Sequence, residues 1–282
     1  MALLRREGFA EYEAFVASFR GRLRADTRVL AVRADNGRSL IDYLREARPA
    51  LVVAVGEAAY RLALRAGIGP LLAVYVVDGA LPEDQAVAAP VAPEQVLAAL
   101  ATLRPEAHTL GVLSGLTPAP AAFERSLARE LRRRSLRVVR LTSPSGAEAM
   151  RQLRREASHL DAIWLLPSPY SLTSRLVRYA IALQLHRRIP LIGVTRQHVR
   201  AGALFALDFT PEQLALAATD QANMLLTRSA ATDGPQARPA SAGAAHRPAG
   251  PGTPRLTINA LTAARLSVDL SGWVARAEII TP

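Results

Sequence analysis

The sequence predicts an α/β protein with two doubly wound, Rossmann-like lobes, each built on a parallel β-sheet, and a cleft between the lobes. Three observations lead to this fold class. The 282 residues reach the size, roughly 250–300 residues, at which a single hydrophobic core stops growing. Hydrophobic residues make up 50% of the chain, enough for two cores. Short apolar runs of strand length alternate with amphipathic helical patterns, and this alternation is typical of parallel sheets.

Residues 161–195 contain the clearest strand–helix–strand unit. The apolar strand at 161–166 ends at Pro167-Ser168-Pro169, a turn through which neither a sheet nor a helix continues. A helix with a 3.6-residue apolar period follows, and a second strand runs from 190 to 195. Ligands bind at the carboxyl ends of the strands in such sheets. The sequence therefore predicts a small-molecule site at the residues around these two strand ends, namely Pro167, Ser168, Tyr170, Ser171 and Thr195.

The first 106 residues predict one lobe. Its helices are expected at 7–24, at 40–47 after a capping Ser39, from Gly56, and from Pro93 to 104; its strands are expected at 28–33, 50–55 and 71–77. A further helix, which starts at Thr210-Pro211 and ends near residue 226, returns to this lobe, so that the lobe comprises residues 1–106 and 207–228.

Two of these strand ends in the first lobe carry candidate binding residues. A helix begins directly after the strand at 50–55, at Gly56-Glu57-Ala58. Its free N–H groups and the positive end of its dipole suit a carboxylate. The alternative is that Gly56 only permits a tight turn. Asp78 closes the strand at 71–77, where it can hold an ammonium or hydroxyl group or cap the following turn.

The second lobe is predicted from residues 107–206 and 255–282. Its first strand, 108–114, ends at Ser114-Gly115, and a second strand runs from 136 to 141. A helix with the densest arginine run lies between them, and another helix follows a capping Ser145. The last 28 residues return as a strand, a short helix and a closing segment. Residues 229–254 are rich in Ala, Gly, Pro and Ser without an apolar period, which predicts a flexible linker.

Seven stretches, in this order and spacing, resemble the substrate-binding proteins of an ABC transporter family whose best-known members are of the tryptophan/tyrosine type. They are PALVVAVGEAA from Pro49, LLAVYVVD from Leu71, TLGVLS from Thr109, DAIWLLP from Asp161, RRIPLIGVT from Arg187, VRAGALFAL from Val199 and LTINALTAARLSVDL from Leu256. The resemblance implies the type I periplasmic binding protein fold and adds Ser114 and Gly115 as a ligand-side loop.

The same resemblance implies a solute receptor that delivers a small molecule, such as an amino acid, to the permease and ATPase subunits of an importer. For a zwitterion, the helix start at Gly56 to Ala58 would take the carboxylate, and Asp78 or a serine of the second lobe would take the ammonium group. Tyr170 would stack on an aromatic ring of the ligand or pack against other side chains of the protein. The implied location is the periplasm or the outer side of the cytoplasmic membrane.

The amino terminus departs from the family pattern, in which a leader and a full strand precede the first helix. Here Met1 to Leu4 form only a stub of a strand and no signal peptide. We therefore expect the first strand to be truncated and the chain to be cut short at its amino terminus. If the start is genuine, the protein is expected in the cytoplasm.

Composition and motifs favour binding over catalysis. The net charge is +11, yet every basic residue is Arg and few aromatics lie among them, so a nucleic-acid partner is not expected. The chain has no cysteine, and its five histidines lack metal-ligand spacing. The Ser114 segment reads G-x-x-S-G rather than the G-x-S-x-G of serine hydrolases. We expect no catalytic residue, metal or cofactor. A cytoplasmic ligand-sensing module and an α/β enzyme with an unrecognised site remain alternatives.

Overall fold

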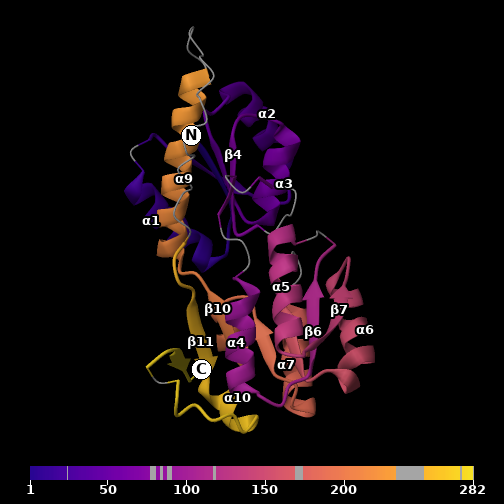
Figure 1. Ribbon diagram of the computed structural model, residues 1–282. Coiled ribbons are helices and arrows are strands. Elements are labelled where there is room, and N and C mark those ends of the chain that lie inside the picture. Colours follow the sequence, from indigo (N-terminus) through magenta and orange to yellow (C-terminus); the bar gives the residue numbers. More distant parts are fainter. Residues whose placement is uncertain are drawn as a thin grey trace. The chain divides into compact units, whose positions relative to one another are not determined.

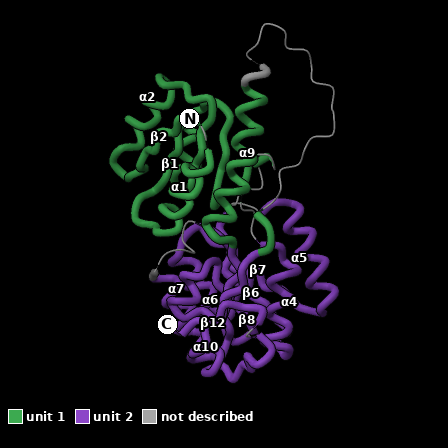
Figure 2. The backbone as a smooth tube through the Cα atoms, turned by 90° about the vertical axis from the view of Figure 1, so that its left-hand side faces the viewer, with its two compact units in different colours: residues 1–76, 80–89, 209–253 green, residues 77–79, 90–208, 254–282 purple. Residues whose placement is uncertain are grey.

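The computed structural model describes residues 1–23, 25–76, 81–82, 85–87, 91–116, 119–168, 174–232, 251–273 and 275–281 (Figure 1). The chain divides into two compact units (Figure 2). Unit 1 contains residues 1–76, 80–89 and 209–253, and unit 2 contains residues 77–79, 90–208 and 254–282. Both units are α/β, and their sheets are mainly parallel, as the alternating pattern of strands and helices predicts.

Unit 1 has a five-stranded parallel sheet with the order β2-β1-β3-β4-β5. The strands are β1 (Ala2–Arg6), β2 (Arg28–Val32), β3 (Val52–Val55), β4 (Leu71–Val74) and β5 (Ala86–Val87). One face of the sheet packs against α1 (Ala10–Arg22) and α9 (Pro211–Thr232), and the other against α2 (Gly37–Ala47) and α3 (Glu57–Ala66). Figure 1 shows these two helix pairs on opposite sides of the strands. Covering both faces explains why β3 and β4 are continuous apolar runs.

The first strand is an interior strand of five residues rather than the stub that the sequence analysis expected. β1 has five residues and pairs in parallel with β2 on one side and β3 on the other. Ala2, Leu3 and Leu4 are buried, with Leu3 in the core under α1 and Leu4 in the core under α2 and α3. Three apolar residues are therefore enough for an interior strand, because the neighbouring strands satisfy its backbone N–H and C=O groups.

Unit 2 has a seven-stranded sheet with the order β12-β11-β10-β9-β8-β6-β7. Every pairing is parallel except that of β10 with β11. The strands are β6 (Thr109–Ser114), β7 (Arg137–Thr142), β8 (Ala162–Leu165), β9 (Leu191–Gly193), β10 (Phe205–Asp208), β11 (Arg255–Asn259) and β12 (Glu278–Ile280).

Helices cover both faces of this second sheet as well. One face packs against α4 (Pro93–Leu103), α5 (Ala121–Arg133) and α10 (Ala260–Arg265), and the other against α6 (Gly146–Glu156) and α7 (Ser174–Arg187). A 3-10 turn (Ala157–His159) follows α6, and the short α8 (Arg196–Ala201) joins β9 to β10. The sequence analysis did not predict α8 or β5.

Two boundaries differ from those expected. α4 belongs to unit 2, although the sequence analysis assigned residues 91–106 to the first lobe, because Val96, Leu97 and Leu100 pack into the same core as Phe123 of α5. α9 continues to Thr232, four residues into the segment 229–254 that was predicted as a linker. The remainder of that segment, 233–250, lies outside the described residues.

The predicted helix starts agree with the structure where a polar side chain caps the helix. The Ser145 hydroxyl accepts a hydrogen bond from the backbone N–H of Glu148 at 3.2 Å. Thr210 and Gln213 form a reciprocal pair at the start of α9, through Thr210 N to Gln213 Oε1 at 2.9 Å and Gln213 N to Thr210 Oγ1 at 3.3 Å. At α2 the predicted Ser39 cap is wrong, because the helix begins after Asn36. In the described part of the chain, every helix is too short or too polar to cross a membrane.

Candidate functional site

The carboxyl edge of the unit 1 sheet contains Gly56, Glu57 and Ala58, where β3 turns directly into α3. Gly56 has φ +83° and ψ 164°, a conformation that residues with a Cβ rarely adopt. Its N–H donates to the Val74 carbonyl at 2.8 Å and its carbonyl accepts from Tyr60 N at 3.0 Å. The N–H groups of Glu57 and Ala58 precede that first helical hydrogen bond and have no acceptor within the helix. A helix therefore starts directly after β3, as expected, and its role in binding an anion stays a prediction.

Tyr12 of α1 lies against this turn. A Cβ added at Gly56 would lie 2.6 Å from the Tyr12 hydroxyl oxygen, so glycine is required for steric as well as conformational reasons. Burial, with a smaller effect from Glu11, raises the pKa of Tyr12 to about 12. The Tyr12 hydroxyl is therefore a neutral hydrogen-bond donor near neutral pH, next to the start of α3. Tyr12 was not among the binding residues predicted from the sequence.

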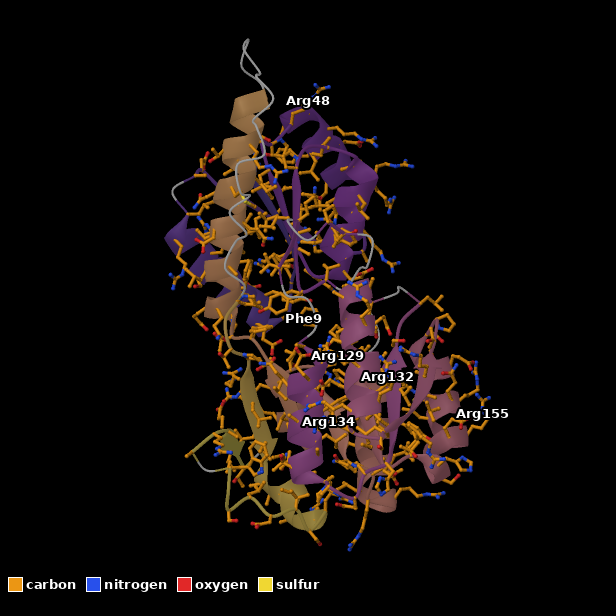
Figure 3. All side chains as sticks on the ribbon, viewed as in Figure 1. Phe9, Arg48, Arg129, Arg132, Arg134 and Arg155 are labelled. Atoms are coloured by element: carbon orange, nitrogen blue, oxygen red, sulfur yellow. The ribbon has the colours of Figure 1, made fainter. Side chains whose placement is uncertain are left out.

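An aromatic cluster, formed by Phe9, Tyr12, Phe15 and Tyr75, surrounds this position. The ring centroids of Tyr12 lie 5.0 Å from Phe9 and 5.2 Å from Tyr75, and Phe15 meets Tyr75 edge-on at 6.1 Å. Tyr75 directly follows β4 and has φ +59°, which is unusual for a bulky residue. Phe9, labelled in Figure 3, is the residue before α1. Had β1 been recognised as a full strand, Phe9 would have been expected at its carboxyl end.

Two further residues that the sequence analysis predicted in the first lobe are Glu57 and Asp78. The Glu57 carboxylate accepts a hydrogen bond from Arg61 at 2.6 Å, four residues along the helix, so its negative charge is partly compensated. Asp78 lies outside the described residues.

The carboxyl edge of the unit 2 sheet carries hydroxyl groups. Ser114 ends β6 and Thr142 ends the neighbouring β7, and their side-chain oxygens are 3.3 Å apart. Gly115 follows Ser114, and Pro167 and Ser168 follow β8, which pairs with β6 on the other side. The structure therefore brings Ser114, Gly115, Pro167 and Ser168 to one edge, as predicted.

Thr195 lies at the same edge, but its side chain caps the start of α8. It precedes α8, and its hydroxyl lies 3.2 Å from Nδ1 of His198, which also accepts the Thr195 N–H at 3.3 Å. This reciprocal cap places a hydroxyl beside an imidazole, but His198 is buried and its Nδ1 is part of the cap. Tyr170 and Ser171 lie outside the described residues.

A charged network, which the sequence analysis did not predict, lies at the end of β10. Asp208 Oδ2 accepts the backbone N–H of Arg196 at 2.8 Å, and Oδ1 accepts from the Arg255 guanidinium at 3.2 Å. Glu278 of β12 pairs with the side chains of both Arg196 and Arg255. Burial raises the pKa of Asp208, although the hydrogen bond from Arg196 and the charge of Arg255 oppose that shift.

The arginine-rich α5 is an amphipathic helix of the second core. Phe123, Leu127 and Leu131 are buried, while Arg129 and Arg132, labelled in Figure 3, are exposed. Glu130 is also buried, and its hydrogen bond from Arg133 lowers its pKa. Within the described ranges, no group of three or more His, Asp or Glu side chains is arranged to hold a metal ion.

Two comparisons with known sequences gave no match, either to a protein-family model or to a curated protein. Solved structures do match. A ligand-free, open substrate-binding protein with adhesive properties from Clostridium difficile superposes with a TM-score of 0.68 at 14% identity, over 99% of this chain and 98% of that one. An ABC domain from Streptococcus pneumoniae in complex with L-Trp gives 0.65 at 16% identity, over 99% of both chains.

The chain has the type I periplasmic binding protein fold. The same fold accounts for a third match, a LacI transcriptional regulator from a Rhodococcus species, with a TM-score of 0.54 at 17% identity over 80% of this chain and 90% of that one. These three matches thus include solute-binding proteins and a transcriptional regulator.

Proposed function

We propose that this chain is the substrate-binding component of an ABC-type importer and that the carboxyl edges of both sheets bind a small molecule. The observation that carries the proposal is the extent of the structural match. The two substrate-binding proteins described above match over 98–99% of both chains, whereas the LacI regulator matches over 80% of this chain, as does an ABC solute-binding protein with bound L-rhamnose over 81%. The permease and ATPase subunits would be its partners, and it would work on the outer side of the cytoplasmic membrane.

The unit 1 edge favours a ligand with a carboxylate on an apolar skeleton. The N–H groups of Glu57 and Ala58 and the positive end of α3 attract an anionic oxygen. The neutral hydroxyl of Tyr12 lies beside them and is able to donate a further hydrogen bond. Phe9 and Tyr75 provide apolar ring surface next to this polar group. An amino acid combines these two features, and L-Trp in the pneumococcal match is an example.

The unit 2 edge supplies acceptors for a positively charged or hydroxylated group. Ser114 and Thr142 form one hydroxyl pair, and Ser168 follows the adjacent strand. Hydroxyl oxygens accept hydrogen bonds from an ammonium group without burying a second charge. We propose Ser114, Ser168 and Asp78 as the groups that take the ammonium end of a zwitterion.

A thermal-shift screen with amino acids, nucleosides and sugars tests the proposed function. An amino acid present at 100 times its Kd is expected to stabilise the protein by about 2.7 kcal/mol, which raises the Tm. The methyl ester of the same amino acid, which has lost the carboxylate charge, is expected to give a much smaller shift. Equal shifts with acid and ester would contradict the role of α3, and chemical conversion of the compound would identify an enzyme instead.

A ligand-sensing module of the same fold is the second candidate, favoured by the similarity to the Rhodococcus regulator. The reading frames beside the gene discriminate between the two. A neighbouring permease and ATPase support the importer, and their absence together with a DNA-binding domain encoded upstream in the same frame supports the sensor.

A further inference from the structure

The chain passes between its two units at residues 76/77, 79/80, 89/90, 208/209 and 253/254. The last two passages lie within described residues, and they run next to each other because Asp208 of β10 and Arg255 of β11 are register partners in an antiparallel pair. Any change in the relative orientation of the units therefore bends the backbone at these passages. The φ and ψ angles of the connecting residues would absorb that change.

On the unit 2 side, the two passages are fixed to each other by Asp208. One of its carboxylate oxygens accepts from the Arg255 side chain of the returning segment, and the other accepts from the backbone N–H of Arg196. Glu278 holds both arginines, so four charged side chains from α8, β10, β11 and β12 form one network. Hydrogen bonds to charged groups are the stronger ones in proteins.

On the unit 1 side, Gln213 makes the equivalent connection. Its side-chain oxygen accepts the Thr210 N–H of the outgoing segment at 2.9 Å, and its side-chain nitrogen donates to the Thr253 carbonyl of the returning segment at 2.9 Å. Gly252, at φ +85°, turns the chain immediately before Thr253. Phe209 packs against the unit 1 core, which fixes the outgoing segment on that side as well.

We propose that Asp208 and Gln213 are positioning residues that limit backbone bending at two of these passages to the junctions 208/209 and 253/254. Few free torsions remain there, because the ring of Pro254 fixes one φ angle and restricts Thr253 before it. The consequence for affinity rests on the proposed function. A receptor with a stiff, short hinge samples fewer arrangements, so a larger fraction of the molecules is competent to bind.

Distance measurements by double electron–electron resonance test the hinge without any ligand. The chain has no cysteine, so Glu46→Cys in unit 1 and Arg154→Cys in unit 2, both exposed, give two unique spin-label sites. Asp208→Asn removes the carboxylate charge and one of the two acceptor oxygens that hold Arg255 and Arg196, and Gln213→Ala removes the Thr253 contact. Each is expected to broaden the distance distribution roughly two-fold, since the spread of a flexible connection grows with the number of free residues.

Matched controls remove similar contacts elsewhere. Glu124→Gln weakens the paired hydrogen bonds with Arg140, and Gln152→Ala removes side-chain contacts to Ser143 and Thr142. Both controls are expected to keep the wild-type distribution. If Asp208→Asn fails to fold, the width of the distance distribution in Gln213→Ala, a variant of the other unit, still tests the proposal. Wild-type widths in the folded hinge variants would overturn the proposal, and so would equal broadening in the controls.

Ligand affinity then separates this inference from the proposed function. With a ligand from the thermal-shift screen, Gln213→Ala is expected to weaken Kd about three-fold or more, because binding-competent arrangements become rarer. An unchanged Kd despite a broadened distribution would overturn the link to affinity. A screen without any ligand would contradict the receptor function and leave the distance result standing.

Discussion

Units 1 and 2 share a backbone plan but differ in the side chains at their strand ends. In unit 1 the edge near α3 is lined by Phe9, Tyr12 and Tyr75, with the start of a helix as its polar group. In unit 2 the corresponding edge carries the hydroxyls of Ser114 and Thr142. The parallel sheet therefore decides where a site lies, and the residues after each strand decide what that site can bind.

The two tryptophans make this difference measurable. Trp164 and Trp273 both belong to unit 2, whereas unit 1 contains Tyr12, Tyr43, Tyr60 and Tyr75 and no tryptophan. Tryptophan fluorescence therefore reports on unit 2, and the tyrosine signal in near-ultraviolet circular dichroism reports mainly on unit 1. The predictions below use these two probes or the ligand to separate the units.

The largest effect is expected from Gly56→Ala in unit 1. The new Cβ would lie 2.6 Å from the Tyr12 hydroxyl and force an alanine into φ +83°, so backbone strain and overpacking together should destabilise unit 1 by about 2–5 kcal/mol. Urea denaturation should lower the tyrosine midpoint and leave the tryptophan midpoint near the wild-type value.

The control for this substitution is Gly21→Ala in α1. Nothing lies within 4 Å of a Cβ added at Gly21, and a helical alanine there should stabilise by about 0.5–1 kcal/mol. A wild-type midpoint for Gly56→Ala would show that the turn tolerates a side chain, and the difference between the two edges would then be smaller than described.

Alkaline pH is expected to weaken unit 1 through Tyr12. Burial raises the folded-state pKa of Tyr12 from 10.0 to about 12. A raised pKa means that the stability contribution is complete below pH 10 and is lost as the pH rises toward 12, by about 2–3 kcal/mol in all. Urea midpoints from the tyrosine signal at successive pH values measure this loss.

Tyr12→Phe provides the comparison for the pH experiment, because it keeps the ring and removes the ionising hydroxyl. This variant should lose much less stability between pH 10 and 12 than the wild type. An equal loss in both proteins would place the alkaline transition elsewhere in the chain.

Ligand affinity should show the smallest effects and should rank the two edges. Tyr12→Phe removes a donor beside the start of α3 and is expected to weaken binding of a carboxylate ligand about ten-fold, close to 1.4 kcal/mol. Ser114→Ala should weaken it only about two- to three-fold, because the Thr142 hydroxyl 3.3 Å away remains as an acceptor. Isothermal titration calorimetry gives both values.

Tyr43→Phe is the matched control, since the Tyr43 hydroxyl accepts a hydrogen bond from Arg28 at 3.1 Å in the same unit. It should leave the affinity unchanged. If Ser114→Ala weakens binding more than Tyr12→Phe, unit 2 rather than unit 1 provides the main anchor for the ligand.

Much of this site could be predicted from local sequence. The apolar runs of β3, β6 and β8 identify buried strands, and residues at or shortly after their carboxyl ends, Gly56, Ser114 and Ser168, lie at the sheet edges as expected. Such residues are predictable because a strand end is fixed by the chain itself. Tyr12 and Phe9 were missed, since a helix start comes to the sheet edge only if β1 exists, and β1 has just three apolar residues.

The sequence by itself therefore determined the fold class, two α/β halves and the strand ends where binding residues lie, because hydrophobic periodicity and turn residues act over a few neighbouring positions. Only the tertiary structure decided that Tyr12 lies against Gly56, that α4 packs in unit 2 and that Asp208 pairs with Arg255. The sequence separation is 44 residues for Tyr12 and Gly56, more than 20 residues for α4 and Phe123, and 47 residues for Asp208 and Arg255. Their energies depend on packing and desolvation, which local patterns do not encode.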